Sequence, residues 1–131
     1  MIKQSKILLI GCSGQLGTKL QETLETSCNL IKPENEKFLF ISFFELKRIL
    51  DGIKPEIIIN TLAFTQVDNA ERDKDKAFFL NAKFPEMISS WCSQNKCFLV
   101  HFSSDYVYSG KGNLPIKETN NASPICYYGV T

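Results

Sequence analysis

The chain has 131 residues, of which 44% are hydrophobic and 22% charged, and its formal net charge is +1. This length and apolar fraction predict one compact domain and argue against a chain that is disordered throughout. The 15 lysines and arginines are scattered, so we expect no nucleic-acid partner, and no apolar run approaches the roughly 20 residues of a membrane span.

The chain begins with short apolar runs separated by amphipathic or polar stretches. Residues 6–10 are apolar after the initial lysine, which predicts a buried strand. Residues 15–26 carry leucines at i, i+4 spacing and predict a helix with one apolar face. Residues 29–32 predict a short strand, whereas the apolar residues 38–41 fall where a loop is expected.

The middle of the chain repeats this alternation of helix and strand. Residues 43–50 predict a helix, which we expect Gly52 and Pro55 to end. Residues 56–60 form a second clear apolar run and predict another buried strand. The polar segment 60–71 then lies at the carboxyl end of that strand, which is where parallel sheets bind their ligands.

The last third contains one long helical pattern, one strand and one long loop. Residues 73–94 predict a helix with an interruption near Pro85. Residues 98–102 predict the fourth strand, and residues 109–124, rich in Gly, Pro, Asn and Ser, predict a long surface loop. A further helix is expected to begin at Tyr127.

Apolar strands that alternate with helices predict a parallel sheet covered on both faces. We therefore predict an α/β fold, a Rossmann-like doubly wound parallel sheet, with residues 1–131 forming one domain. Right-handed crossovers predict the strand order 3-2-1, with the fourth strand beside the first.

Three glycines between the first strand and the first helix predict a phosphate-binding turn. Residues 11–17 read Gly-Cys-Ser-Gly-Gln-Leu-Gly, a GxxGxxG variant of the dinucleotide fingerprint. Gly11 permits the tight turn, Gly14 lets the backbone approach a pyrophosphate, and Gly17 lets the helix pack on the sheet. The helix amino terminus adds free N–H groups and a partial positive charge. The alternative is that these glycines serve only the turn.

The residues after the second strand do not choose between the two nicotinamide cofactors. A dinucleotide site places an acidic residue there for a ribose 2′-hydroxyl, or a basic residue for a 2′-phosphate. Both signs of charge occur here, at Lys32, Glu34, Glu36 and Lys37. The expected cofactor is therefore NADPH or NADH.

Two further segments carry candidates for chemistry at the ends of predicted elements. Residues 101–108 read His-Phe-Ser-Ser-Asp-Tyr-Val-Tyr, and residues 127–131 read Tyr-Tyr-Gly-Val-Thr. Taken alone, Ser104 and Asp105 fit capping of a strand end, and Tyr128 fits a core aromatic at a helix start. These segments therefore acquire a chemical role only in combination with the glycine turn.

The cysteine, histidine and acidic residues form no metal-binding pattern. The single histidine, His101, is interpreted as a core or edge residue, and the cysteines are odd in number without CxxC spacing. The cysteines are Cys12, Cys28, Cys92, Cys97 and Cys126, and the acidic residues of one solvated helix face are Asp68, Glu71, Asp73 and Asp75. We expect no metal and reduced thiols. Because residues 1–6 do not resemble a signal peptide, we also expect a cytoplasmic protein.

Taken together, these motifs resemble the extended short-chain dehydrogenases, and most closely the dTDP-4-dehydrorhamnose reductase family. That family carries a GxxGQxG turn, an N-x-A-A/F-T-x-V-D-x-A-E segment, an S-T/S-D-Y-V-F/Y segment and a Y-G-x-T-K helix start, which the chain matches in order. The resemblance implies an NAD(P)H-dependent oxidoreductase that reduces the 4-keto group of a dTDP-6-deoxy-4-keto-hexose to dTDP-L-rhamnose. It implies a nucleotide-sugar substrate and leaves a homodimer open.

The resemblance also implies site residues. Tyr128 matches the catalytic tyrosine, and Ser104 matches the hydroxyl residue that hydrogen-bonds the substrate carbonyl. The implied cofactor-binding residues are Gly11, Ser13, Gly14, Gln15, Leu16, Gly17, Leu62, Ala63, Thr65 and Ser103. The implied substrate-binding residues are Val67, Asp105 and Tyr106.

The chain departs from the family pattern at two places. A family Leu-Asp-Ile-Thr-Asp loop reads Leu-Phe-Ile-Ser-Phe here, so Phe40 and Phe43 replace two carboxylates, the first of them near the adenosine end. The family lysine four residues after Tyr128 falls beyond Thr131, as does the C-terminal sugar-binding region. We therefore expect these 131 residues alone to be inactive, as a fragment or as part of a longer enzyme.

Two other functions fit the same motifs. One is another extended short-chain enzyme, such as a nucleotide-sugar epimerase or dehydratase. The other is a non-catalytic NADP-binding regulatory subunit, because the β subunit of methionine adenosyltransferase resembles this reductase family. The presence of Ser104 and Tyr128 favours an enzyme.

Overall fold

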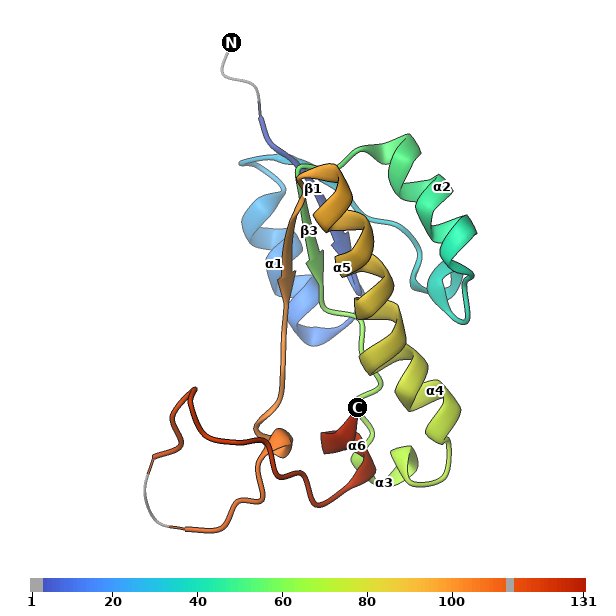
Figure 1. The fold of residues 1–131 in the computed structure, drawn as a ribbon. Helices are drawn as coiled ribbons and strands as arrows, with labels where there is room; N and C mark the ends of the chain where they lie inside the picture. Colours follow the sequence, from blue (N-terminus) through green and yellow to red (C-terminus); the bar gives the residue numbers. More distant parts are fainter. Residues whose placement is uncertain (1–3, 113–114) are drawn as a thin grey trace.

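The computed structural model describes residues 4–112 and 115–131. At its centre lies an all-parallel sheet with the strand order β2-β1-β3-β4. The strands are β1 (Lys6–Ile10), β2 (Asn29–Ile31), β3 (Ile57–Asn60) and β4 (Phe98–His101). Helices cover both faces of this sheet (Figure 1), which confirms the doubly wound α/β fold.

The two faces of the sheet bury alternate residues of the same strands, as the apolar runs predict. Ile7 and Leu9 of β1 face α1 (Gln15–Leu24). Leu8 and Ile10 face the opposite layer, formed by α2 (Phe43–Ile53) and α5 (Phe84–Asn95). Both faces of β1 are therefore buried, and this burial stabilises the sheet by about 1.5–3 kcal/mol per large apolar side chain.

The predicted strand order is wrong. The sequence led us to expect 3-2-1-4, whereas β3 pairs with β1 rather than with β2. The reason is that Phe38 and Ile41 are buried in the cluster beneath α2 and α5, so α2 starts on the face opposite α1. A right-handed crossover on that face carries the chain back past β1 and sets β3 on its other side.

The boundaries of α2 follow from its caps rather than from Gly52. Ser42 and Glu45 form a reciprocal capping box at its start, in which each side chain binds the other residue's backbone N–H. The helix runs through Gly52, which was expected to end it, and stops at Lys54, whose φ of 50° is left-handed. Before α2, the expected loop at residues 38–41 is preceded by a 3₁₀ turn, η1 (Asn35–Phe38).

The long helix expected over residues 73–94 is a continuous series of three segments. These are α4 (Lys74–Phe78), the π-helical η2 (Phe79–Lys83) and α5. The interruption falls just before Pro85, as predicted, because proline has no N–H to donate to the carbonyl of Asn81. π-helical segments of this kind occur frequently at functional sites.

Short elements gather beyond the carboxyl ends of the strands, at the lower end of Figure 1. They are α3 (Val67–Ala70), η3 (Asp105–Val107) and α6 (Tyr127–Val130). The expected surface loop at residues 109–124 has no helix or strand where it is described. Within the described parts of the chain, no helix is long and apolar enough to cross a membrane.

Candidate functional site

A cleft of about 770 Å³ opens at the carboxyl ends of β1, β3 and β4. It is lined by residues from segments that are far apart in the sequence. The lining comprises Gly11, Ser13, Gly14, Gln15, Leu16, Gly17, Asn35, Thr61, Leu62, Ala63, Thr65, Asn81, His101, Phe102, Ser103, Ser104, Val107, Tyr128, Gly129 and Thr131. All the residues expected to bind the cofactor or to be catalytic are in this set, and none of the lining residues is an acid, a lysine or an arginine.

The three glycines of the turn differ in what they allow. Gly11 has a φ of 89°, and a Cβ there would lie 2.4 Å from the backbone nitrogen of Leu62. A Cβ on Gly17 would lie 2.1 Å from the carbonyl oxygen of Gly11. Gly14 has an ordinary φ of −75°, and its added Cβ would meet only the Gly11 oxygen, at 3.5 Å. The protein's own packing therefore requires glycine at 11 and 17 but not at 14.

The amino terminus of α1 faces the cleft without a side-chain cap. Gly14 is the capping residue and makes no side-chain hydrogen bond. The first N–H groups of a helix have no intrahelical acceptor and carry a partial positive charge. The turn itself is held by the Cys12 carbonyl, which accepts hydrogen bonds from Gln21 at 2.6 Å and from the Thr18 hydroxyl at 3.4 Å. The arrangement offers backbone donors to an anion.

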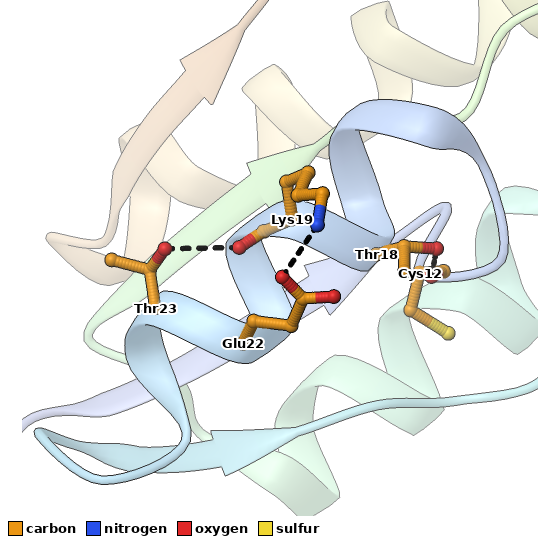
Figure 2. A network of polar contacts seen from close by, with 5 residues as sticks. All are labelled: Cys12, Thr18, Lys19, Glu22 and Thr23. Carbon is orange, nitrogen blue, oxygen red and sulfur yellow. Dashed lines mark hydrogen bonds and ion pairs between the residues drawn. The ribbon is translucent and has the colours of Figure 1, made fainter.

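Figure 2 shows that the polar side chains on the outer face of α1 bind one another and the backbone. Lys19 forms an ion pair with Glu22 at 2.8 Å, and the Thr23 hydroxyl donates to the Lys19 carbonyl at 2.9 Å. Lys19 is not among the residues that line the cleft. An anion at the turn would therefore be held by backbone N–H groups and neutral side chains rather than by this ammonium group.

Asn35, the first residue of η1, stabilises the glycine turn, although nothing in the sequence singled it out. Its Oδ1 accepts from the N–H of Gly11 at 3.1 Å, and its Nδ2 donates to Ser13 Oγ at 2.7 Å. The charged residues that we expected there, Lys32, Glu34, Glu36 and Lys37, do not line the cleft. Two of them are lysines held in ion pairs, with Glu25 and with Glu34. A neutral amide thus occupies this side of the cleft.

The end of β3 supplies two polar side chains with structural roles. Thr61 Oγ1 lies 2.9 Å from the carbonyl of Ile10 and 3.0 Å from that of Gly11. Asn60 is buried, accepts from the N–H of Leu62 at 3.2 Å, and lies 3.3 Å from His101 Nδ1 through its own Nδ2. Burial lowers the pKa of His101, and the backbone of Asn60 offsets part of that effect. His101, interpreted as a core or edge residue, lies on the outer strand of the described sheet and lines the cleft.

Asn81 of the π-helical segment connects three parts of the cleft wall and was also missed. Its amide binds both the N–H and the carbonyl of Phe64, at 2.7 and 3.1 Å. Its Nδ2 also lies 3.1 Å from the Thr131 hydroxyl. The only hint in the sequence was the expected interruption of this helix near Pro85. Asn81 thereby fixes the loop after β3 against the end of α6.

Three contacts position Tyr128 at the cleft. Its ring meets that of Tyr106 edge to face, with centroids 5.4 Å apart. The next residue, Gly129, is needed there because a Cβ would lie 2.1 Å from the Tyr106 carbonyl oxygen. The N–H of Tyr127 donates to Glu71 at 2.7 Å. Together these contacts hold α6 against η3 and α3.

Ser104 both caps η3 and lines the cleft. Its Oγ accepts from the N–H of Tyr106 at 3.2 Å and donates to Asp105 at 3.3 Å. The three expected substrate-binding residues lie outside the lining: Asp105 contacts Ser104, Tyr106 packs on Tyr128, and Val67 begins α3.

Phe40 and Phe43, which replace the two carboxylates of the family loop, also lie outside the cleft lining. Phe40 has a φ of 55° and packs on Phe79 with ring centroids 5.0 Å apart. Phe43 opens α2 and is partly exposed. Within the described residues, no group of three or more cysteine, histidine, aspartate or glutamate side chains is placed to hold a metal ion.

A doubly wound parallel sheet with a glycine turn, an uncapped first helix and a cleft across the strand ends defines the class of nucleotide-binding α/β domains. Residues 5–131 match the family model described as the RmlD substrate binding domain. The chain belongs to that family.

Similar proteins are longer than this chain. It is 36% identical over 129 residues to dTDP-4-dehydrorhamnose reductase of Salmonella typhimurium; the aligned part covers 95% of this chain and 43% of that protein. It is 32% identical over 126 residues to the Bacillus subtilis spore coat polysaccharide biosynthesis protein SpsK; here the aligned part covers 95% of this chain and 44% of that protein. The chain thus spans less than half the length of these curated relatives.

Solved structures agree with the fold. The dTDP-4-dehydrorhamnose reductase of Bacillus anthracis, in complex with NADP, is 30% identical with a TM-score of 0.90, and the match covers 99% of this chain and 47% of that one. A UDP-glucose 4-epimerase from Brucella ovis, in complex with NAD, is 18% identical with a TM-score of 0.76, over 96% of this chain and 44% of that one. The second likeness concerns the fold alone.

Proposed function

We propose that this chain is the cofactor-binding portion of an NAD(P)H-dependent dTDP-4-dehydrorhamnose reductase, with residues 1–131 forming its dinucleotide-binding domain. In this proposal the protein reduces the 4-keto group of a dTDP-6-deoxy-4-keto-hexose and yields dTDP-L-rhamnose. The observation that carries it is the convergence of the glycine turn, the end of β3, Ser104 and Tyr128 on one cleft. The relatives with this name, one of them in complex with NADP, support it.

The residues of the turn fit a dinucleotide diphosphate. A Cβ at Gly14 would make only ordinary contact with the protein, so the packing of the chain does not require glycine there. The missing side chain leaves room on the cleft side. The uncapped N–H groups of residues 15–17 point the partial positive charge of α1 toward that room. Ser13 lies alongside, and its Oγ is oriented by Asn35 Nδ2 at 2.7 Å. Neutral donors suffice there because each hydrogen bond to a charged oxygen contributes about 1.5–3 kcal/mol.

The reaction adds a hydride and a proton across the C4 carbonyl of the sugar, two electrons and two protons in all. The reduced nicotinamide, when bound, supplies the hydride that reaches C4. Tyr128 donates its phenolic proton to the oxygen that becomes an alkoxide. Ser104 hydrogen-bonds the same oxygen. The N–H of Tyr106 occupies a lone pair of Ser104 Oγ, and the hydroxyl, which donates to Asp105 Oδ1 across 3.3 Å in the structure, turns its hydrogen to the substrate.

The proposal extends to the partners of the protein. The substrate is a nucleotide sugar, for which Val67, Asp105 and Tyr106 are the proposed contacts; two of them adjoin the cleft lining, Asp105 through Ser104 and Tyr106 through Tyr128. The cofactor is NADPH or NADH. We place the protein in the cytoplasm, where both cofactors and sugar nucleotides occur, and propose a homodimer as its assembly.

Calorimetry and turnover test the proposal together. NADPH is titrated into the chain and into its Tyr128→Phe variant, and NADPH oxidation is followed with dTDP-4-keto-6-deoxy-L-lyxo-hexose. For turnover, the polypeptide includes any sequence that follows Thr131 in its gene. We expect both proteins to bind NADPH with similar affinity, because the phenolic hydroxyl acts in proton transfer, and only the unmodified protein to reduce the sugar.

Two outcomes would contradict this assignment. If neither NADPH nor NADH binds, the chain has no dinucleotide site and the assignment is wrong. Tight binding without reduction of the keto sugar would instead favour a non-catalytic NADP-binding subunit, which shares the cleft but not the chemistry.

A further inference from the structure

His101 is a cleft residue to which the proposed reaction assigns no role. It is the only histidine of the chain and ends β4, directly opposite Asn60 in the register of the two parallel strands. Asn60 is 1% exposed and is the single buried polar side chain found in the described parts of the chain. A buried amide beside an imidazole at a ligand cleft calls for an account of its hydrogen bonds.

The orientation of the Asn60 amide fixes the state of the imidazole. The N–H of Leu62 donates to Asn60 Oδ1 at 3.2 Å, so the amide oxygen is directed toward the backbone. Its Nδ2 then faces His101 Nδ1 at 3.3 Å, and an amide NH₂ group can only donate. Nδ1 must therefore accept, which requires a neutral ring with its proton on Nε2.

The second ring nitrogen then carries a proton, and no side-chain acceptor for it is found among residues 4–112 and 115–131; the backbone of Asn60 is the other polar group recorded against the ring. His101 is exposed and lines the cleft, while its Nδ1 edge is turned to the buried Asn60. Nε2 is on the opposite side of the ring. The chain thus presents a single, pre-oriented N–H donor to whatever occupies this part of the cleft.

The position in the sheet tells which part of a dinucleotide this donor meets. The glycine turn follows β1, and β4 lies two strands away on the side of Ser103 and Ser104. Neighbouring strands are about 4.8 Å apart, so His101 lies roughly 10 Å across the sheet from the turn. With the diphosphate at the turn, that displacement reaches the nicotinamide nucleoside.

We infer that His101 is a cofactor-contacting residue whose Nε2–H donates to an oxygen of the nicotinamide nucleoside, and that Asn60 is the positioning residue that keeps this proton on Nε2. The inference rests on the proposed function, since it requires a nicotinamide dinucleotide in the cleft. It adds a donor from β4 to the glycine turn, Ser104 and Tyr128.

Because the chain has one imidazole, its nitrogen resonances report the state of this residue without ambiguity. Long-range ¹H–¹⁵N spectra of the free chain at neutral pH should show a protonated Nε2 and an unprotonated Nδ1. A ring protonated on Nδ1, or on both nitrogens, overturns the inference before any ligand is added.

The same spectra with two ligands locate the contact. NADPH should shift the Nε2 resonance, whereas 2′-phosphoadenosine 5′-diphosphate, which lacks the nicotinamide nucleoside, should bind the turn and leave the imidazole unchanged. If NADPH binds without moving Nε2, this inference fails and the proposed function stands. If neither ligand binds, both fail.

Two substitutions separate the donor from the bulk of the ring. His101→Gln keeps an N–H in place of Nε2–H, and His101→Phe removes it while keeping an aromatic ring. We expect the phenylalanine variant to bind NADPH about three- to tenfold more weakly, the range of one lost hydrogen bond, and the glutamine variant to retain near-normal affinity. Equal losses in both variants, or an equal loss for the adenosine ligand, would overturn the assignment.

Discussion

Substituting the second and third glycines of the turn should separate what the fold needs from what the ligand needs. In Gly17→Ala, the new Cβ would lie 2.1 Å from the carbonyl oxygen of Gly11 and 2.8 Å from Cys12 Cα. In Gly14→Ala, the new Cβ would lie 3.5 Å from the same oxygen, which is ordinary contact, and its backbone φ of −75° suits alanine.

The geometry gives different magnitudes for the two variants. The Gly17→Ala contact is roughly 1.3 Å shorter than ordinary contact at 3.4 Å, so α1 must move away from the turn at Gly11, and overpacking of this kind costs about 1–3 kcal/mol or more. Alanine is less favourable than glycine at a helix N-cap. For Gly14→Ala we expect this preference to cost under about 1 kcal/mol of stability. In Gly14→Ala, however, the methyl group stands between a diphosphate and the helix N–H groups. Losing one such charged hydrogen bond weakens binding at least about tenfold.

Urea denaturation followed by the fluorescence of Trp91, the only tryptophan, measures the free energy of unfolding. Calorimetry with NADPH measures the affinity. We expect Gly17→Ala to lose both stability and affinity, and Gly14→Ala to lose affinity while remaining nearly as stable as the unmodified chain. A Gly14→Ala variant that binds NADPH within roughly twofold of normal would refute the reasoning, because the space at that glycine would then serve no ligand.

Three other outcomes follow from the contacts described above. Gly129→Ala should leave the unfolding of the sheet largely unchanged but displace α6, because its Cβ would lie 2.1 Å from the Tyr106 carbonyl oxygen; loss of the Tyr106–Tyr128 ring contact in NOE spectra is the measurement, and an unchanged contact contradicts it. Asn81→Leu should free the loop at Phe64 from Thr131 and increase amide hydrogen exchange in that loop, with unchanged exchange as the contrary result. Ser42→Ala should destabilise the chain by about 1 kcal/mol at neutral pH by removing a helix cap. Hydrogen bonds from Ser42 lower the pKa of Glu45 below its ordinary 4.5, so the part of the capping stabilisation that comes from this carboxylate is present above that pH and is lost as pH falls through the lowered pKa. A Ser42→Ala deficit in urea unfolding that stays constant into acid contradicts this explanation.

Much of the fold was readable from the sequence because the relevant signals are local. An apolar run such as Lys6–Ile10 must be buried wherever it is placed, and the glycines at 11 and 17 mark a tight turn followed by a closely packed helix. The strands, the main helices, the turn and the carboxyl-end location of the cleft were therefore predicted. The signature residues Ser104 and Tyr128 also pointed to the correct end of the sheet.

The tertiary structure alone decided the strand order and the residues that hold the cleft together. The position of β3 depends on which face buries Phe38 and Ile41, and an apolar residue has no local preference for one face. Asn35, Asn60 and Asn81 act across 24, 41 and 50 residues of chain through side-chain hydrogen bonds. The sequence does not distinguish an asparagine of an exposed loop from one that makes such long-range hydrogen bonds, because the partners come near only when distant segments fold together.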